Sequence, residues 1–253
     1  MNNIYYAIAS YHRPKCKTYH ALKECGIEDE RIVISLNDSN DFNSYVEALG
    51  SQAQIITRHG NNVASNRNNI LNQFENGAKI ILLDDDVRDF RKWEEKQGNK
   101  CGTLKKITEL DKMFDEVFSF MQKNDIHFMG CLPTTNLMNI SKLNRTGEQY
   151  SYNTLLQGGL NFVIKSEEIK FDEKWDMLED YELNLRMIRQ GYIIARINNI
   201  VPNKSLMGKE KGGMYDRYQR GEQKLWLRRL VNKYPDMVTK KDRTVLLKRK
   251  WRI

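Results

Sequence analysis

The sequence predicts an α/β fold with a mostly parallel, doubly wound sheet. Between residues 4 and 83, short apolar segments alternate with amphipathic segments of helical length, an order typical of right-handed βαβ units. Three consecutive aspartates directly follow the fourth apolar segment. Open α/β sheets bind their ligands at the carboxyl ends of their strands, so this acidic triplet marks the expected ligand-binding edge.

Turn-forming residues mark the ends of the expected strands and helices between residues 4 and 83. Pro14 favours the start of a helix, and Gly26, Gly50 and Gly77 each stop a helix that crosses between strands. The expected strands are residues 4–9, 31–36, 54–57 and 80–83, and the expected helices are residues 17–25, 42–49 and a segment that follows the loop 59–69.

The second half of the chain is less regular. Apolar residues at helical spacing predict a helix over residues 110–121. Residues 88–102 are polar without a clear period, which predicts a mobile loop. Residues 132–157 predict a long loop with regular structure only in pieces. Because loops of this length often bind ligands, we expect this one to bind the acceptor. The further expected strands are residues 126–131, 160–164 and 192–197.

Composition is that of a soluble globular protein, because 40% of the 253 residues are hydrophobic and 29% are charged. No apolar run approaches the roughly 20 residues that span a bilayer, and the N-terminus lacks the pattern of a secretion signal. We therefore expect a cytoplasmic protein, in the host cytoplasm if it is viral. The four cysteines form no Cys-x-x-Cys pair, which argues against a zinc site and a disulfide framework.

Positive charge is concentrated near the C-terminus. The chain carries a net charge of +8, but residues 201–253 alone carry 16 Lys or Arg and 5 Asp or Glu. We therefore expect an α/β domain that carries the ligand-binding edge over residues 1–200, and a basic, mainly helical C-terminal extension over residues 201–253. Because aromatic residues are interleaved with the cations, this extension favours a nucleic-acid partner, with a solvated basic face as the alternative.

The acidic triplet Asp84-Asp85-Asp86 is the strongest chemical signal in the sequence. Adjacent carboxylates repel one another, so a divalent cation and the phosphates that it bridges would stabilise them. The alternative is a solvated acidic turn. Arg67 lies near the start of a helix that faces the same edge, where it could bind phosphate or form a surface salt bridge.

Further candidate site residues surround this edge. Ser10, Tyr11 and Arg13 follow the first strand and could hold a nucleotide base and phosphate. The pair Glu179-Asp180 lies in the first turn of an expected helix, where interaction with the helix dipole is the alternative explanation. The glycines and lysines of residues 203–214 could close over a diphosphate, although the spacing of a P-loop is absent.

These features together resemble the nucleotide-diphospho-sugar glycosyltransferases with the GT-A fold. The resemblance covers residues 4–200 and rests on the acidic triplet as an Asp-x-Asp motif, on Gly158-Gly159 and on Glu179-Asp180. More narrowly, the chain resembles the TET/JBP-associated glycosyltransferases. The segments that carry this closer resemblance are Ser10-Tyr11-His12-Arg13, Asn66-Arg67-Asn68, the acidic triplet and residues 209–214.

The resemblance implies an activity and a set of partners. Its GT-A part implies a metal-dependent transferase that moves a sugar from a nucleoside-diphosphate donor, with UDP expected, to a hydroxyl acceptor. Its narrower part implies an association with phages and DNA modification, and a hydroxymethylpyrimidine in DNA as acceptor. The basic C-terminal segment is compatible with DNA binding.

The resemblance also implies roles for individual residues. Asp86 would bind Mn²⁺ or Mg²⁺, and Asp84 would bind the same metal, its water or the donor ribose. Asp180 would be the general base, with Glu179 as its substitute. The residues implied in donor binding are Ser10, Tyr11, Arg13, Arg67, Asp84, Asp85, Lys209 and Lys211, of which the two lysines would assist the leaving phosphate.

The sequence departs from the GT-A pattern in one respect, because none of its four histidines follows residue 150. A late histidine often supplies a metal ligand in GT-A enzymes, and Asp216 or water would have to replace it. A carboxylate near the acceptor occurs in both inverting and retaining members. Three alternatives stay open: the same chemistry on a glycan, lipid or protein acceptor, a non-catalytic nucleic-acid-binding α/β protein, and a nucleotidyltransferase.

Overall fold

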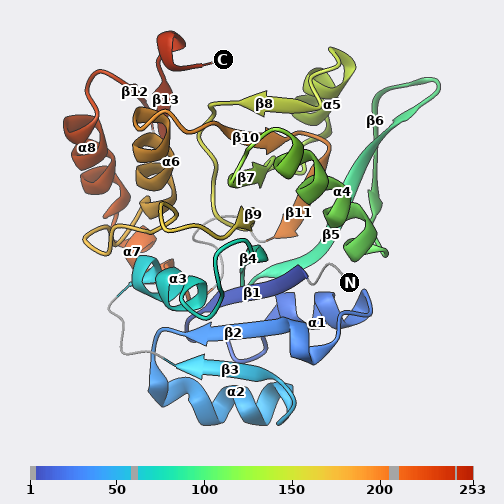
Figure 1. The fold of residues 1–253 in the computed structure, drawn as a ribbon, viewed down its shortest axis with the longest axis vertical. Coiled ribbons are helices and arrows are strands. Elements are labelled where there is room, and N and C mark those ends of the chain that lie inside the picture. Colours follow the sequence, from blue (N-terminus) through green and yellow to red (C-terminus); the bar gives the residue numbers. More distant parts are fainter. Residues whose placement is uncertain (1–3, 58–61, 205–210, 243, 253) are drawn as a thin grey trace.

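The computed structural model describes residues 4–57, 62–204, 211–242 and 244–252. Within these ranges, eight strands form the main sheet in the order β3-β2-β1-β4-β9-β7-β10-β8 (Figure 1). All of them run in one direction except β9 and β8, which pair antiparallel with their neighbours. The strands are β1 Ile4–Ser10, β2 Ile32–Leu36, β3 Gln54–Thr57, β4 Lys79–Asp84, β7 Phe128–Cys131, β8 Tyr150–Tyr152, β9 Leu160–Ile164 and β10 Ile194–Ile197. The predicted α/β class with a mostly parallel sheet is confirmed.

Helices cover both faces of this sheet, as the doubly wound prediction requires. Alternate residues of β4 face opposite ways: Ile81 and Leu83 join the core under α1, α2 and α4, whereas Ile80 and Leu82 join the core under α3, α6 and α8. The helices are α1 Lys17–Glu24, α2 Phe42–Leu49, α3 Val63–Leu71, α4 Leu110–Lys123, α5 Leu137–Arg145, α6 Glu179–Arg189, α7 Tyr215–Gln219 and α8 Gln223–Lys233, with 3₁₀ turns η1 Asp29–Arg31, η2 Ser39–Asp41 and η3 Arg249–Trp251.

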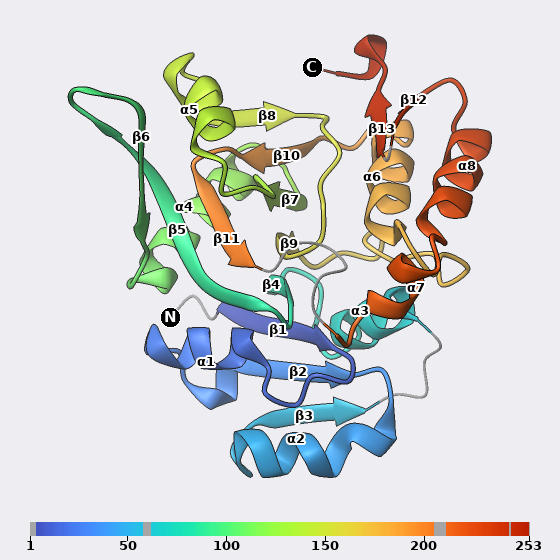
Figure 2. The same ribbon diagram turned by 180° about the vertical axis from the view of Figure 1, so that it is seen from behind.

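The prediction of a mobile loop over residues 88–102 is wrong. This segment forms a long β-hairpin, β5 Val87–Lys96 and β6 Asn99–Lys106, which pairs with β11 Ile200–Lys204 in a second sheet (Figure 2). Phe90 is fully buried, but most of β5 is half exposed. Polar residues in β5 therefore obscure the alternation of apolar and polar residues on which strand prediction depends. The loop expected over residues 132–157 does contain pieces of regular structure, namely α5 and β8.

The C-terminal segment packs against the rest of the protein. In α8, Trp226, Leu227 and Leu230 are buried in the same core as α6, and the Trp226 ring lies 5.6 Å from that of Trp175. A two-stranded hairpin follows, made of β12 Val238–Lys241 and β13 Thr244–Leu247. A domain boundary at residue 200 stays a prediction. In the described part of the chain, no helix is long and apolar enough to cross a membrane.

Candidate active site

A cleft of about 1020 Å³ opens at the carboxyl ends of β1 and β4. The parallel register pairs Ala9 with Asp84, which brings the segment after β1 beside the acidic triplet. The first turn of α6, the end of β11, and α7 with the start of α8 form further parts of the walls. The predicted site residues that line this cleft are Ser10, Tyr11, Arg13, Arg67, Asp84, Asp85, Asp86, Glu179 and Asp180.

The two predicted lysines, Lys209 and Lys211, differ from the other predicted site residues. Lys209 lies outside the described residues. Lys211 is exposed, and its backbone carbonyl, rather than its ammonium group, enters the local network by accepting a hydrogen bond from Arg13 Nε at 2.9 Å. The side chain of Lys211 is thus free to face solvent at the rim.

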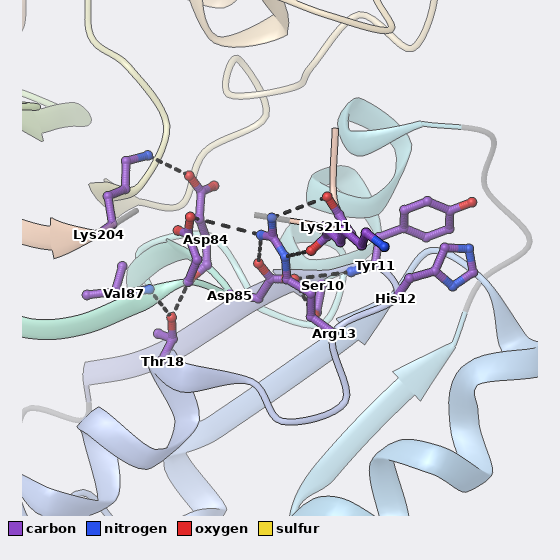
Figure 3. Close-up of polar contacts among 12 residues, drawn as sticks. Ser10, Tyr11, His12, Arg13, Thr18, Asp84, Asp85, Val87, Lys204 and Lys211 are labelled. Carbon is purple, nitrogen blue, oxygen red and sulfur yellow. Dashed lines mark hydrogen bonds and ion pairs between the residues drawn. The ribbon is translucent and has the colours of Figure 1, made fainter. Parts of the chain in front are cut away.

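The first carboxylate of the triplet, Asp84, lies between two cations, Arg67 and Lys204, of which Figure 3 shows Lys204. Its Oδ1 atom accepts from Arg67 Nη2 at 3.1 Å, and its Oδ2 atom accepts from Lys204 Nζ at 2.8 Å. Burial alone would raise the pKa of Asp84, but Lys204 and Arg67 outweigh burial and lower it to about 2. Asp84 is therefore ionised, and both its oxygens are already paired.

The second carboxylate, Asp85, anchors the loop after β1. It accepts from Arg13 Nη1 at 2.6 Å, from Ser10 Oγ at 2.7 Å and from the backbone N–H of Tyr11 at 3.3 Å (Figure 3). Burial raises the pKa of Asp85, and Arg13 opposes that shift. Asp85 lines the cleft but is almost fully buried, and its contacts hold Ser10, Tyr11 and Arg13 in position.

Arg13 also ties this loop to the chain after β11. Its Nη2 atom donates to the carbonyl of Gly212 at 3.2 Å, and Gly213 N–H donates to the carbonyl of Tyr11 at 2.9 Å. Gly212 has φ of 86°, and a β-carbon there would lie 2.7 Å from Arg13 Cγ. Only glycine allows this close approach. This explains why a glycine occupies position 212, within the segment predicted to close over a diphosphate.

The third carboxylate, Asp86, is the one that lacks a close partner. Among the described residues, its buried Oδ1 atom has no hydrogen-bond partner, and Oδ2 lies 4.0 Å from Arg13 Nη1. Burial and the neighbouring Asp84 raise the pKa of Asp86 to about 6. Asp86 is thus the carboxylate whose charge a further cation would stabilise most.

A divalent cation fits this site through Asp86. The described residues contain no cluster of three or more His, Cys, Asp or Glu side chains that could hold a metal by themselves. A hard cation with one carboxylate ligand completes its coordination with water and substrate phosphates, which is common for Mg²⁺. The unpartnered Oδ1 atom of Asp86 suits that arrangement, whereas the paired oxygens of Asp84 do not.

Thr18 fixes the turn that presents the triplet. Its Oγ1 atom donates to the backbone carbonyl of Asp84 at 2.6 Å and accepts from the N–H of Val87 at 2.9 Å (Figure 3). Thr18 is fully buried at the first turn of α1. The sequence analysis did not single it out, because a threonine in a helix carries no signal of a long-range contact.

Arg67 connects the two acidic parts of the cleft. It is only 5% exposed, and its Nη1 atom lies 2.7 Å from Glu179 Oε1 while Nη2 contacts Asp84. A β-carbon at Gly158 would lie 2.4 Å from Nη2, so glycine leaves room for the guanidinium. The alternative of a surface salt bridge for Arg67 is therefore wrong, because Arg67 is buried and pairs with the buried Glu179.

Asparagines hold α3 in the position that aims Arg67. Asn62 caps the helix by accepting from Ser65 N–H at 2.9 Å, and Asn66 donates to the carbonyl of Ser35 at 3.0 Å. Asn68 both donates to the carbonyl and accepts from the N–H of Phe171. These buried amides explain why α3 is rich in asparagine, and they fix its orientation against β2 and the segment before α6.

Lys204 is a cation that lines the cleft and was not among the predicted site residues. It ends β11, and its Nζ atom donates to Asp84 and, at 3.1 Å, to the carbonyl of Gly158. Gly159 has φ of 121°, and a β-carbon there would lie 2.6 Å from Nζ. The glycine pair Gly158-Gly159 thus makes room for Lys204 and Arg67.

Glu179 and Asp180 enter the cleft after a strained residue. Leu178 precedes α6 with φ of 61°, a left-handed conformation that costs of order 1–3 kcal/mol in a non-glycine residue and is concentrated at functional sites. Glu179 is 6% exposed and paired with Arg67, and burial raises its pKa to about 7 even beside that cation. Glu179 is therefore closed off from a large acceptor.

Asp180 is the more accessible carboxylate. Its Oδ2 atom accepts from Gly158 N–H and its Oδ1 atom from Tyr181 N–H, each at 2.8 Å, and the residue stays partly exposed to the cleft. Burial raises the pKa of Asp180, while Arg67 and these N–H groups oppose the shift. A fixed, partly exposed carboxylate with a raised pKa has the properties of a general base.

The fold and this cleft define an α/β protein with a charged ligand-binding cleft at the carboxyl ends of its strands, and the sequence comparison identifies its family. Residues 14–213 match the family model described as TET-Associated Glycosyltransferase. The chain belongs to that family, and it is a glycosyltransferase. A search of curated proteins finds no match.

Two solved structures are similar to this chain over most of their length. One is a putative nucleotide-diphospho-sugar transferase from Desulfovibrio desulfuricans G20, with 9% identity, a TM-score of 0.46 and coverage of 92% of this chain and 99% of that chain. The other is CMP:2-keto-3-deoxy-manno-octonic acid synthetase complexed with CTP, with 10% identity, a TM-score of 0.45 and coverage of 86% and 96%.

Proposed function

We propose that this enzyme transfers a sugar from a nucleoside-diphosphate donor, UDP in the first instance, to the hydroxyl of a hydroxymethylpyrimidine in DNA, and that it requires Mn²⁺ or Mg²⁺. The proposed binding of the donor and the metal rests on one observation, the buried and unpartnered Oδ1 atom of Asp86 beside the cations of the cleft. The net charge of +11 over residues 201–253 supports a polyanionic acceptor.

In this proposal, the donor lies along the carboxyl ends of β1 and β4. Ser10, Tyr11 and Arg13 bind the nucleotide, and Asp86 holds the divalent cation. When bound, that cation stabilises the negative charge that gathers on the departing diphosphate. Arg67 and Lys204 keep Asp84 ionised and hold the end of β4 in place. Lys211 and Lys209 stay proposed helpers of the leaving phosphate.

The transfer step needs one proton acceptor. The acceptor oxygen attacks the anomeric carbon, the bond from that carbon to the diphosphate oxygen breaks, and the acceptor proton passes to a carboxylate oxygen of Asp180. Asp180 suits this role because it is partly exposed, whereas Glu179 is buried against Arg67. This assignment applies to an inverting transfer.

Mass spectrometry tests the acceptor directly. We expect that an oligonucleotide with one 5-hydroxymethylcytosine, incubated with the enzyme, Mn²⁺ and pooled nucleotide sugars, gains the mass of one sugar. The same oligonucleotide with unmodified cytosine is the control and should stay unchanged. An unchanged mass of the hydroxymethylated strand with every donor would contradict the DNA acceptor and favour a glycan, lipid or protein acceptor.

A further inference from the structure

A second cavity, of about 610 Å³, adjoins the active-site cleft. One wall comes from β8 and β10, and the other comes from β13 and the C-terminal residues. Figure 2 shows the C-terminal hairpin beside this end of the main sheet. Its volume falls within the roughly 300–1,000 Å³ of typical ligand pockets. We call this cavity the C-terminal groove.

The C-terminal groove and the cleft share part of their walls. Tyr181 and Thr244 line both cavities, whereas the acidic triplet lines the cleft alone. Tyr181 directly follows Asp180, so the groove meets the cleft beside the proposed base and away from the proposed donor. A molecule that extends from an acceptor hydroxyl at Asp180 can therefore continue into the groove.

Positive charge inside the groove has no carboxylate partner. Arg196 is half buried, and its Nε atom donates to Asn198 Oδ1 at 2.9 Å, but no described carboxylate lies within ion-pair distance of its guanidinium. Burial lowers the pKa of Arg196. Arg252, at the other wall, is exposed and donates through Nε to the carbonyl of Leu247.

The surroundings of the groove reinforce this charge. Further exposed cations occur on β12 and η3 and have no ion-pair partner among the described residues: Lys240, Lys241, Arg249 and Lys250. Glu148 is the acidic residue among those that line the groove. The wall formed by the C-terminal residues is thus positively charged, and it complements a polyanion.

Aromatic rings from β8 complete the groove. Tyr150 and Tyr152 both line it and are partly exposed. The Tyr150 ring stacks on Phe120 at 3.8 Å between centroids, which holds it rigidly. Rigid aromatic rings beside cations are the usual means by which proteins bind single-stranded nucleic acid, because bases stack on the rings while the cations contact phosphates.

We propose that the C-terminal groove binds the nucleic-acid strand that flanks the acceptor nucleotide, through Arg196, Arg252 and Tyr152. This inference rests on the proposed DNA acceptor and adds the place where the strand lies. The acceptor nucleotide itself occupies the cleft near Asp180, and its neighbours along the strand pass Tyr181 and Thr244 into the groove.

Binding of a fluorescein-labelled single-stranded oligonucleotide, measured by anisotropy over a range of salt concentrations, tests the inference. We expect Tyr152→Leu to weaken binding about tenfold through lost stacking. We expect Arg252→Gln to weaken binding and to reduce the slope of log K against log salt by about 0.7 if it removes one phosphate contact. Arg252 is exposed, so its replacement leaves the fold intact.

The control is Lys96→Gln, an exposed lysine at the end of β5, on a hairpin that Figure 1 shows far from the C-terminal hairpin. It should bind as the parent does. All three variants should bind UDP as the parent does, because the groove lies outside the donor site.

The possible outcomes distinguish failure of the groove proposal from failure of the proposed DNA acceptor. If the parent glycosylates the oligonucleotide and the groove variants bind it as Lys96→Gln does, the strand lies elsewhere and the groove proposal is overturned. Loss of UDP binding in the groove variants would also overturn it. If the parent neither binds nor modifies any oligonucleotide but modifies a peptide or glycan, the proposed acceptor itself is wrong.

Discussion

Replacement of Asp180 by asparagine is expected to lower the rate of sugar transfer by about 10²–10⁴-fold, the usual contribution of a positioned general base. In the parent enzyme the rate should rise with pH as Asp180 loses its proton, through a pKa that burial raises above the ordinary value. Asp180→Asn should lose this pH dependence. The oligonucleotide assay by mass spectrometry at several pH values measures both effects.

Two controls make this result specific to proton transfer. Asp180→Asn keeps one acceptor oxygen, which can accept from the N–H of either Gly158 or Tyr181, and UDP binding that persists in this variant will show that the cleft is intact. Glu179→Gln should retain most of the rate, because glutamine can still accept from Arg67. The reverse pattern, with activity lost in Glu179→Gln and kept in Asp180→Asn, would assign the base to Glu179.

Replacement of Arg67 by methionine is expected to destabilise the fold by roughly 3–5 kcal/mol, since it removes the cation of a buried pair and leaves its partners uncompensated. Glu179 and Asp84 both contact this guanidinium, and the Glu179 side chain is only 8% exposed. Urea unfolding followed by circular dichroism measures the free energy of unfolding of the variant and the parent.

The matched control is Arg220→Met. Arg220 pairs with Glu222 at 2.7 Å, but its side chain is 61% exposed, and exposed pairs contribute about 0–1 kcal/mol. Adding Glu179→Gln to Arg67→Met should restore part of the lost stability, because it removes one of the uncompensated carboxylates. Equal losses for Arg67→Met and Arg220→Met would contradict the view that Arg67 holds the two acidic parts of the cleft together.

The half of the fold that the sequence predicted well is the half whose signals are local. The strands β1 to β4 are short apolar runs, and glycines end the helices between them. The spacing of apolar residues and the positions of these glycines were therefore enough to predict this part of the fold. Asp84, Asp85 and Asp86 follow β4 directly, and the rule that ligands bind at strand ends placed them correctly in a cleft with Arg13 and Arg67.

The contacts that the sequence could not predict join residues that are far apart in the chain. Lys204 pairs with Asp84 across 120 residues and lies at the end of β11, a strand that belongs to the second sheet. No local pattern marks such a lysine, because its partner is determined by the packing of two sheets. Likewise, the triplet looks uniform in sequence, yet its three carboxylates have different partners and differently shifted pKa values.

The most direct test of the donor site is isothermal titration calorimetry of UDP with and without Mn²⁺, on the parent and on Asp86→Ala. The control is Asp89→Ala, which removes a nearby carboxylate that does not line the cleft. We predict Mn²⁺-dependent UDP binding by the parent and by Asp89→Ala, and its loss in Asp86→Ala. Absence of UDP binding by the parent, or binding that neither Mn²⁺ nor the loss of Asp86 affects, would contradict a metal-assisted donor site at the end of β4.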